Sequence, residues 1–441
     1  MGWVRFLALA GLGWVAAAAT RPPIYADLAD RARAQPPEFA ANVLLRIADA
    51  PGVTDGAWKR EILEDAFHMA AGAQQPFARR SWTGKPDGLF DKAYAQRLDA
   101  LTLQSKAVRA MLAIDYKKAR ELFGEIPPLE IPRLECGDAM VYDVSAFYAT
   151  ADEVAARAFN AKEVADEEPF HFLLRYAAAA TSPAQVAPIA RMIAGASLKP
   201  AQSEALVNAL AGALMQLPGD DRSFSATSPG DADSALAGLQ AECTSRKIDA
   251  QPLLAAWRAY VARQTGGARC ADSAAHAPRY TGQCESPQCR QLEAQYIGLV
   301  TANGYGLTAE QKASSEWSGK LRKYLAALAD WTDDDDPAEY FRFKTRFYSE
   351  LFELAPKGPD RDLLLSTLLG WLQQNGYQRE HRVEWFYPVD ALIVRAFADP
   401  VGMQAAVREL RRSADPVIAL YADLEQLLPR PLEERMELLL R

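Results

Sequence analysis

Apolar residues recur every three or four positions along most of the chain, which is the pattern of amphipathic helices. The pattern is clearest in residues 36–73, where two apolar faces flank a Pro-Gly turn at 51 and 52. The first face consists of Phe39, Val43, Leu44 and Ile47, and the second of Trp58, Ile62, Ala66, Phe67 and Ala70. This spacing predicts a helical hairpin with a short turn.

Four dipeptides indicate further helix starts, because each places a capping Ser or Asp before a proline. They are Ser182-Pro183, Asp336-Pro337, Asp399-Pro400 and Asp415-Pro416. Asp336 is followed three residues later by Glu339, so this acidic segment fits a capping box better than a calcium loop. Only residues 382–389 (RVEWFYPV) are rich in strand-forming residues, and a connection between helices explains them equally well. We therefore predict an all-α fold of helical hairpins stacked as an α-solenoid or a toroid-like array.

Residues 115–126 (DYKKARELFGEI) carry Tyr116, Ala119 and Phe123 at the spacing of an aromatic, a small and a second aromatic residue. In this respect the segment resembles the second helix of a tetratricopeptide repeat. The resemblance covers only this segment, because the later alanine and proline positions of the repeat fall on Ile126 and Ile131 here. It implies a superhelical groove that binds peptides or protein segments, and it assigns no catalytic residue.

Residues 1–19 (MGWVRFLALAGLGWVAAAA) have the features of a secretory signal peptide. Arg5 precedes an apolar run, and Ala17 and Ala19 form the small-residue pattern that a signal peptidase accepts. The run is shorter than the roughly 20 residues that a membrane-spanning helix needs. We therefore expect export to the periplasm or the extracellular space.

Composition divides the rest of the chain into three parts. Residues 20–217 are expected to form an N-terminal helical array, and residues 293–441 a C-terminal one. Residues 218–292 between them contain a loop, a helical hairpin near 234–263 with Trp257 and Tyr260 as core anchors, and a cysteine-rich loop. The apolar stretch 205–217 is too short to cross a membrane, so it predicts a core helix and no integral membrane segment after signal cleavage.

The net charge of the chain narrows the classes of partner that it can bind. The 441 residues include 49 Lys and Arg and 57 Asp and Glu, a net charge of −8, and the basic clusters are small. Such a chain lacks the electrostatic footprint of a protein that binds nucleic acid or an anionic membrane.

Three of the five cysteines lie in residues 270–289, together with His276. Their spacing is not the paired short spacing of a structural zinc site, and an exported location favours oxidation. We therefore expect a disulfide that joins Cys270 to Cys284 or Cys289, and neither a metal ion nor another cofactor. Several pairings of the five cysteines stay open.

Residues 377–390 (YQREHRVEWFYPVD) hold the densest mixture of aromatic and ionisable side chains. Tyr377, Trp385 and Tyr387 are candidate binding residues because their rings can stack on a sugar or grip a peptide. His381 and Glu384 are candidate acid–base residues, and Glu380 and Asp390 can add polar contacts. In the alternative interpretation, Trp385 and Phe386 anchor the segment in the core.

Two functions are consistent with these patterns. The first is an exported helical-repeat scaffold that binds a protein or peptide partner. The second is an exported all-α hydrolase or lyase that acts on polysaccharide with carboxylates on helix-end loops. The chain has no G-x-S-x-G, H-E-x-x-H or nucleotide-binding motif, which favours the scaffold.

Overall fold

The protein is described by a computed structural model that covers residues 21–79, 88–134, 140–219, 221, 223, 230–265, 284–302, 305–332, 336–376 and 382–440. The expected signal peptide lies outside these residues. The described part is all-α, as predicted. Its short strands form two antiparallel pairs, β1 (Phe77–Arg79) with β2 (Met140–Tyr142) and β3 (Thr301–Ala302) with β4 (Tyr305–Gly306).

The N-terminal helices confirm the predicted hairpin. They are α1 (Pro23–Arg33), α2 (Pro37–Ala48), α3 (Gly56–Ala70), α4 (Gly88–Ala95), α5 (Ala100–Leu112) and α6 (Tyr116–Glu125). The nine apolar residues predicted for the two faces of α2 and α3 are all buried. The carboxylate of Asp55 starts α3 by accepting from two backbone N–H groups, and α3 then packs between α2 and α5.

A second set of helices follows. Two of them cover the segment predicted as a hairpin near 234–263, but each packs chiefly on another helix of the set and not on its neighbour in the sequence. The set comprises α7 (Ser145–Arg157), α8 (Ala161–Ala165), α9 (Glu168–Ala178), the 3-10 helix η1 (Pro183–Gln185), α10 (Val186–Gly195), α11 (Pro200–Gln216), α12 (Asp231–Arg246) and α13 (Gln251–Thr265). Trp257 and Tyr260 of α13 are buried, as expected, and their rings stack at 5.6 Å. The indole of Trp257 also donates to Asp233 of α12 at 2.7 Å, which ties the two helices together.

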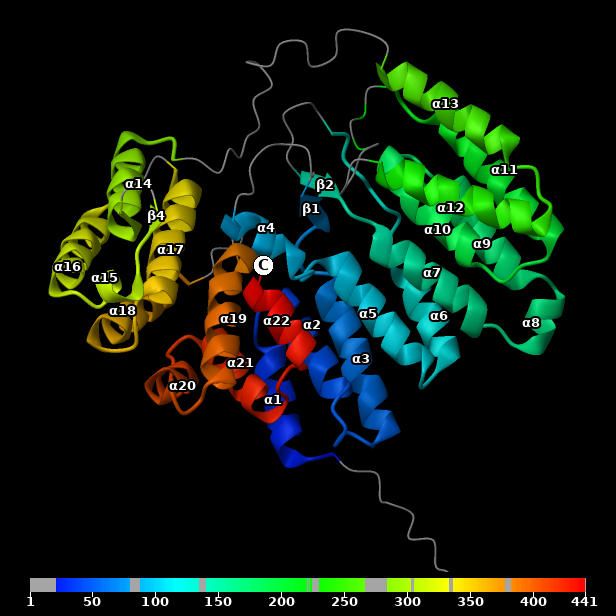
Figure 1. The fold of residues 1–441 in the computed structure, drawn as a ribbon. Coiled ribbons are helices and arrows are strands. Elements are labelled where there is room, and N and C mark those ends of the chain that lie inside the picture. Colours follow the sequence, from blue (N-terminus) through cyan, green and yellow to red (C-terminus); the bar gives the residue numbers. More distant parts are fainter. Residues whose placement is uncertain are drawn as a thin grey trace, which may run out of the picture.

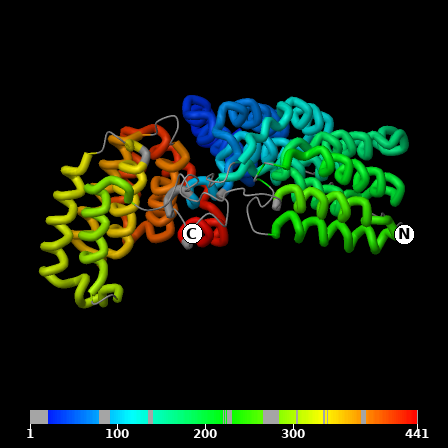
Figure 2. Tube along the Cα trace, turned by 90° about the horizontal axis from the view of Figure 1, so that it is seen from above, coloured from blue at the N-terminus to red at the C-terminus, as the bar shows by residue number. Residues whose placement is uncertain are grey.

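The remaining helices complete a third set and return the chain to its start. They are α14 (Pro287–Val300), α15 (Ala309–Lys312), α16 (Ser315–Asp330), α17 (Pro337–Leu354), α18 (Pro359–Gln374), α19 (Arg382–Ala398), α20 (Gln404–Arg411), α21 (Pro416–Leu427) and α22 (Leu432–Leu440). Helix α19 packs against α4, and α21 packs against α1 and α2. Figures 1 and 2 show the result: α14–α18 lie at one end and α9–α13 at the other. Between them the first described helices, α1 and α2, meet α21, and we refer to this place as the junction of the chain ends.

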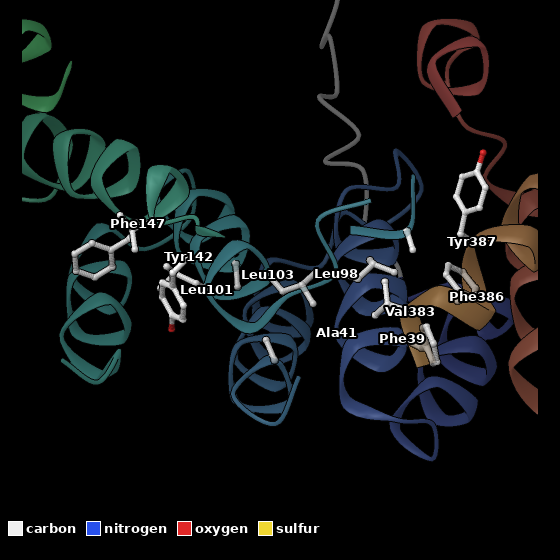
Figure 3. Packing of buried hydrophobic residues seen from close by; sticks show 14 of the residues in the cluster. Phe39, Ala41, Leu98, Leu101, Leu103, Tyr142, Phe147, Val383, Phe386 and Tyr387 are labelled. Atoms are coloured by element: carbon white, nitrogen blue, oxygen red, sulfur yellow. The ribbon is translucent and has the colours of Figure 1, made fainter. Parts of the chain in front are cut away.

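Aromatic rings form the core where the chain ends meet. The ring of Phe386 in α19 lies 4.7 Å from Phe39 in α2 and 4.5 Å from Tyr421 in α21. Phe39 and Phe386 are labelled in Figure 3. Helices from opposite ends of the sequence therefore share one hydrophobic core.

Three of the four capping predictions are confirmed, one of them at a 3-10 helix, and the fourth is wrong. Asp336 and Asp415 accept backbone N–H bonds at the starts of α17 and α21. Ser182 caps the 3-10 helix η1, which runs into α10. At Asp399 the prediction is wrong: its carboxylate accepts from the N–H of Gly402 and closes a turn, and α20 starts only at Gln404.

Residues 382–389 belong to α19, so neither a strand nor a connection between helices is correct. Pro388 lies inside this helix. Residues 383–390 are all buried, so the helix has no polar face to give the segment a helical period. Its run of aromatic and branched residues therefore looked like a strand.

The cysteine-rich segment is joined differently from the expectation. Cys284 and Cys289 are bonded to each other, with their Cα atoms 5.3 Å apart, so both expected partners of Cys270 are occupied. Cys270 itself lies outside the described residues. The start of α14 brings Cys289 back over Cys284, which makes a local bridge geometrically easy. Cys243 is buried and has a free thiol.

No helix within the described ranges is both long and apolar enough to cross a membrane.

Candidate binding cavity

The candidate residues of segment 377–390 divide between the core and the undescribed part. Tyr377, Glu380 and His381 lie outside the described residues. Trp385 is 1% exposed, and its indole donates to the carbonyl oxygen of Leu372 at 2.8 Å. The structure therefore places this ring in the core, where it anchors α19 and cannot stack on a ligand. Glu384 and Tyr387 are buried as well, and Tyr387 borders a small pocket of about 100 Å³.

A larger cavity of about 680 Å³ lies where the chain ends meet. Residues of α2, α3, α5, α19 and α22 line it, together with the segment that joins α4 to α5. Helix α19 contributes Phe386 and, one turn later, Asp390. Among the described residues of the predicted site, Asp390 is the one polar residue that borders this cavity.

Asp390, Arg430 and Gln96 form a cluster of paired side chains in the cavity lining, which we call the floor. The guanidinium of Arg430 donates to both carboxylate oxygens of Asp390, at 2.7 and 2.5 Å. The amide of Gln96 donates to the same carboxylate at 3.0 Å. A bidentate pair of this kind holds both planar groups in one orientation.

Glu425 does not line the cavity itself, but it contacts Arg46 and Arg430, which do. It is 1% exposed and accepts from Arg46 at 3.1 Å and from the Nε and backbone N–H of Arg430, both at 2.9 Å. Burial alone would raise the pKa of Glu425, but Arg430 and Arg46 hold it below its usual value. In the same way, burial opposes the charge of Arg430, but Asp390 and Glu425 raise the pKa of that guanidinium. The floor is therefore a fixed set of compensated charges.

The walls carry charges that are not all compensated. Arg97 pairs with Asp143 outside the cavity. The ammonium groups of Lys59 in α3 and Lys106 in α5 form no hydrogen bond or ion pair with any described residue. The acidic side chains Asp49, Glu434 and Glu437 also line the cavity. Solvent reaches Lys106 through the opening, but the surrounding protein removes enough water to lower the pKa of its ammonium group.

This arrangement is suited to binding. The cavity volume lies in the range of about 300–1,000 Å³ that is typical of ligand sites. Its described lining combines apolar side chains such as Leu45 and Phe386 with charges of both signs. Fixed, paired charges orient a ligand, and the free ammonium groups give it a place to form new ion pairs.

Comparisons with protein-family models, curated proteins and solved structures find no match to this chain. The tetratricopeptide resemblance of residues 115–126 therefore gains no support from relatives. In the structure, Ala119 and Phe123 of α6 are buried, but Tyr116 is 38% exposed and does not occupy the packed position of a repeat residue.

The cavity residues have no local sequence signature. Arg46, which lines the cavity, and Glu425, which holds it in place, are 379 positions apart. They meet only because α21 packs on α2. A single hint was present in the sequence, namely Asp390 beside the aromatic run of α19.

Proposed function

We propose that this protein is an exported α-helical scaffold that binds a segment of a protein partner in the cavity where its chain ends meet. One observation carries the proposal: the cavity has room for several side chains and offers both apolar and charged contacts. A protein segment can satisfy both kinds of contact, whereas a neutral sugar chain would leave Lys59 and Lys106 without ionic partners.

The proposal also includes how and where the scaffold works. The helical hairpins stack as an α-solenoid, and the signal peptide directs the chain to the periplasm or the extracellular space. The succession of contacts from α2 to α3, α5 and α7 supports the stacked arrangement.

A displayed library of random peptides, panned against the full mature chain, tests the binding function. We expect recovered peptides to lose binding when Ala113, which lines the cavity and is exposed, is changed to Trp. The matched control is Ala201→Trp, an exposed helical alanine of α11 outside the cavity. Peptide binding that Ala113→Trp leaves intact would contradict the proposal. Release of sugar fragments from a panel of polysaccharides would instead support the hydrolase or lyase.

A further inference from the structure

The two free ammonium groups of the cavity lie on neighbouring helices. Lys59 is on α3 and Lys106 is on α5, and these helices pack against each other. The other three cations that line the cavity are Arg46, Arg97 and Arg430, and each has a carboxylate partner. Lys59 and Lys106 therefore form a cationic wall that has no ionic partner in the described part of the chain.

The C-terminal helix α22 presents acidic side chains to this cavity. Glu434 and Glu437 line the cavity together with Leu438, whereas Glu433 does not. Asp99 and, to a smaller extent, Glu434 favour the charged form of Lys106, yet neither forms an ion pair with it. The helix thus brings negative charge toward the cationic wall without completing the contact.

Helix α22 is also held lightly. Leu432 and Met436 are 66% and 44% exposed, and most other residues of the helix are exposed or only partly buried. The Nε of Arg435 is buried without a hydrogen-bond partner, which is unfavourable where the helix now lies. Few buried contacts and an unsatisfied polar group are features of an element that detaches easily.

From this geometry we infer that the bound partner segment is acidic and that α22 holds its place in the unbound protein. The inference rests on the proposed function, because it names the chemistry of the segment bound in the same cavity. Carboxylates of the partner pair with Lys59 and Lys106, and α22 moves aside to admit them. We expect the partner segment to carry the same pattern as Glu434, Glu437 and Leu438, namely two acids one turn apart next to an apolar residue.

The test uses the full mature chain and a labelled synthetic peptide, LEERMELLL, which copies residues 432–440. The variant Glu434→Gln/Glu437→Gln weakens the attraction of α22 to the cavity, and Glu433→Gln is the matched control on the same helix. We expect the double variant to bind the peptide at least about tenfold more tightly than the control, since charge-assisted contacts are worth about that factor each. Hydrogen exchange of residues 432–440 should be faster in the double variant.

Two further measurements identify the contacts. Adding Lys59→Gln and Lys106→Gln to the double variant should return the affinity to that of the control. The peptide LQQRMQLLL, in which glutamine replaces each glutamate, should bind at least about tenfold more weakly than the acidic one. Equal binding of the two peptides, or binding that is independent of both lysines, would overturn the inference.

The failure of this inference is distinguishable from failure of the proposed function. If library peptides bind and are lost in Ala113→Trp but contain no Asp or Glu, the scaffold function stands and the acidic partner is rejected. If the loosened variant binds the acidic peptide no better than the control, α22 does not hold the place of a partner.

Discussion

The junction of the chain ends and the helices α16–α18 both bury charge, but they compensate it differently. At the junction, Glu425 is 1% exposed and contacts two guanidinium groups, those of Arg46 and Arg430. In α17, Lys344 is 4% exposed and forms no ion pair with a described carboxylate. Its ammonium group donates to the carbonyl oxygen of Trp331 at 2.9 Å and to the hydroxyl of Tyr340 at 2.8 Å.

The difference shows how the kind of partner determines the response of a buried charge to pH. Arginine partners keep the pKa of Glu425 low, so its charge persists at neutral pH. Lys344 has only neutral acceptors and the rings of Tyr340 and Trp371, at 4.8 and 4.9 Å. Desolvation therefore lowers its pKa from 10.5 to about 8, although the more distant Asp330 opposes this shift. The stability that Glu425 contributes is therefore expected to be insensitive to mild alkali, whereas the contribution of Lys344 in α17 is expected to change with pH in that range.

The largest expected effect comes from Glu425→Ala. The change leaves the buried guanidinium of Arg46 without a carboxylate and removes one of the two partners of Arg430. Breaking a buried pair in this way should lower the free energy of unfolding by about 3–5 kcal/mol, measured by urea denaturation. Asp423→Ala is the control on the same helix, because Asp423 forms more exposed pairs with Arg31 and Arg411 and should cost at most about 1 kcal/mol. Equal losses would contradict the comparison.

The next effect is a dependence of stability on pH that comes from Lys344. Its pKa is lower in the folded protein than in the unfolded chain, so between about pH 8 and pH 10 the unfolded state binds more protons. Stability of the wild type relative to Lys344→Met should therefore rise across this range, by up to about 3 kcal/mol. Urea denaturation of both proteins at several pH values measures the difference. Lys320→Met, on the exposed face of α16, should show no such rise, and a flat difference for Lys344→Met would refute the role of this lysine.

Sequence patterns predicted the helices that bury one face and expose the other. The hairpin of α2 and α3 was predictable because each helix has one apolar face, and Asp336 and Asp415 were recognisable caps because they act on backbone two or three residues away. Asp399 precedes a proline in the same way but closes a turn instead. A dipeptide therefore indicates a cap only when the following residues also form a helix.

The candidate binding cavity could not be predicted, because long-range packing creates it. Arg46, Glu425 and Lys106 each look like an ordinary solvent-exposed charge in their local sequence. Only the meeting of the chain ends brings the first two into one buried contact. Trp385 illustrates the opposite error: an aromatic residue among charges suggested a binding surface, but residues 383–390 of α19 are all buried.

The smallest expected effect is that of Tyr340→Phe, and it examines the neutral acceptors of Lys344 directly. Removing the hydroxyl takes away one acceptor from the charged ammonium group, so the variant should lose about 1 kcal/mol of stability at pH 7. Near pH 10 Lys344 is neutral in the folded protein and gains less from this acceptor, so the loss should be smaller there. Denaturation at both pH values measures the two losses, with Tyr305→Phe in the exposed strand β4 as the control. An equal loss at both pH values would mean that the hydroxyl of Tyr340 stabilises the protein in a way that does not depend on the charge of Lys344.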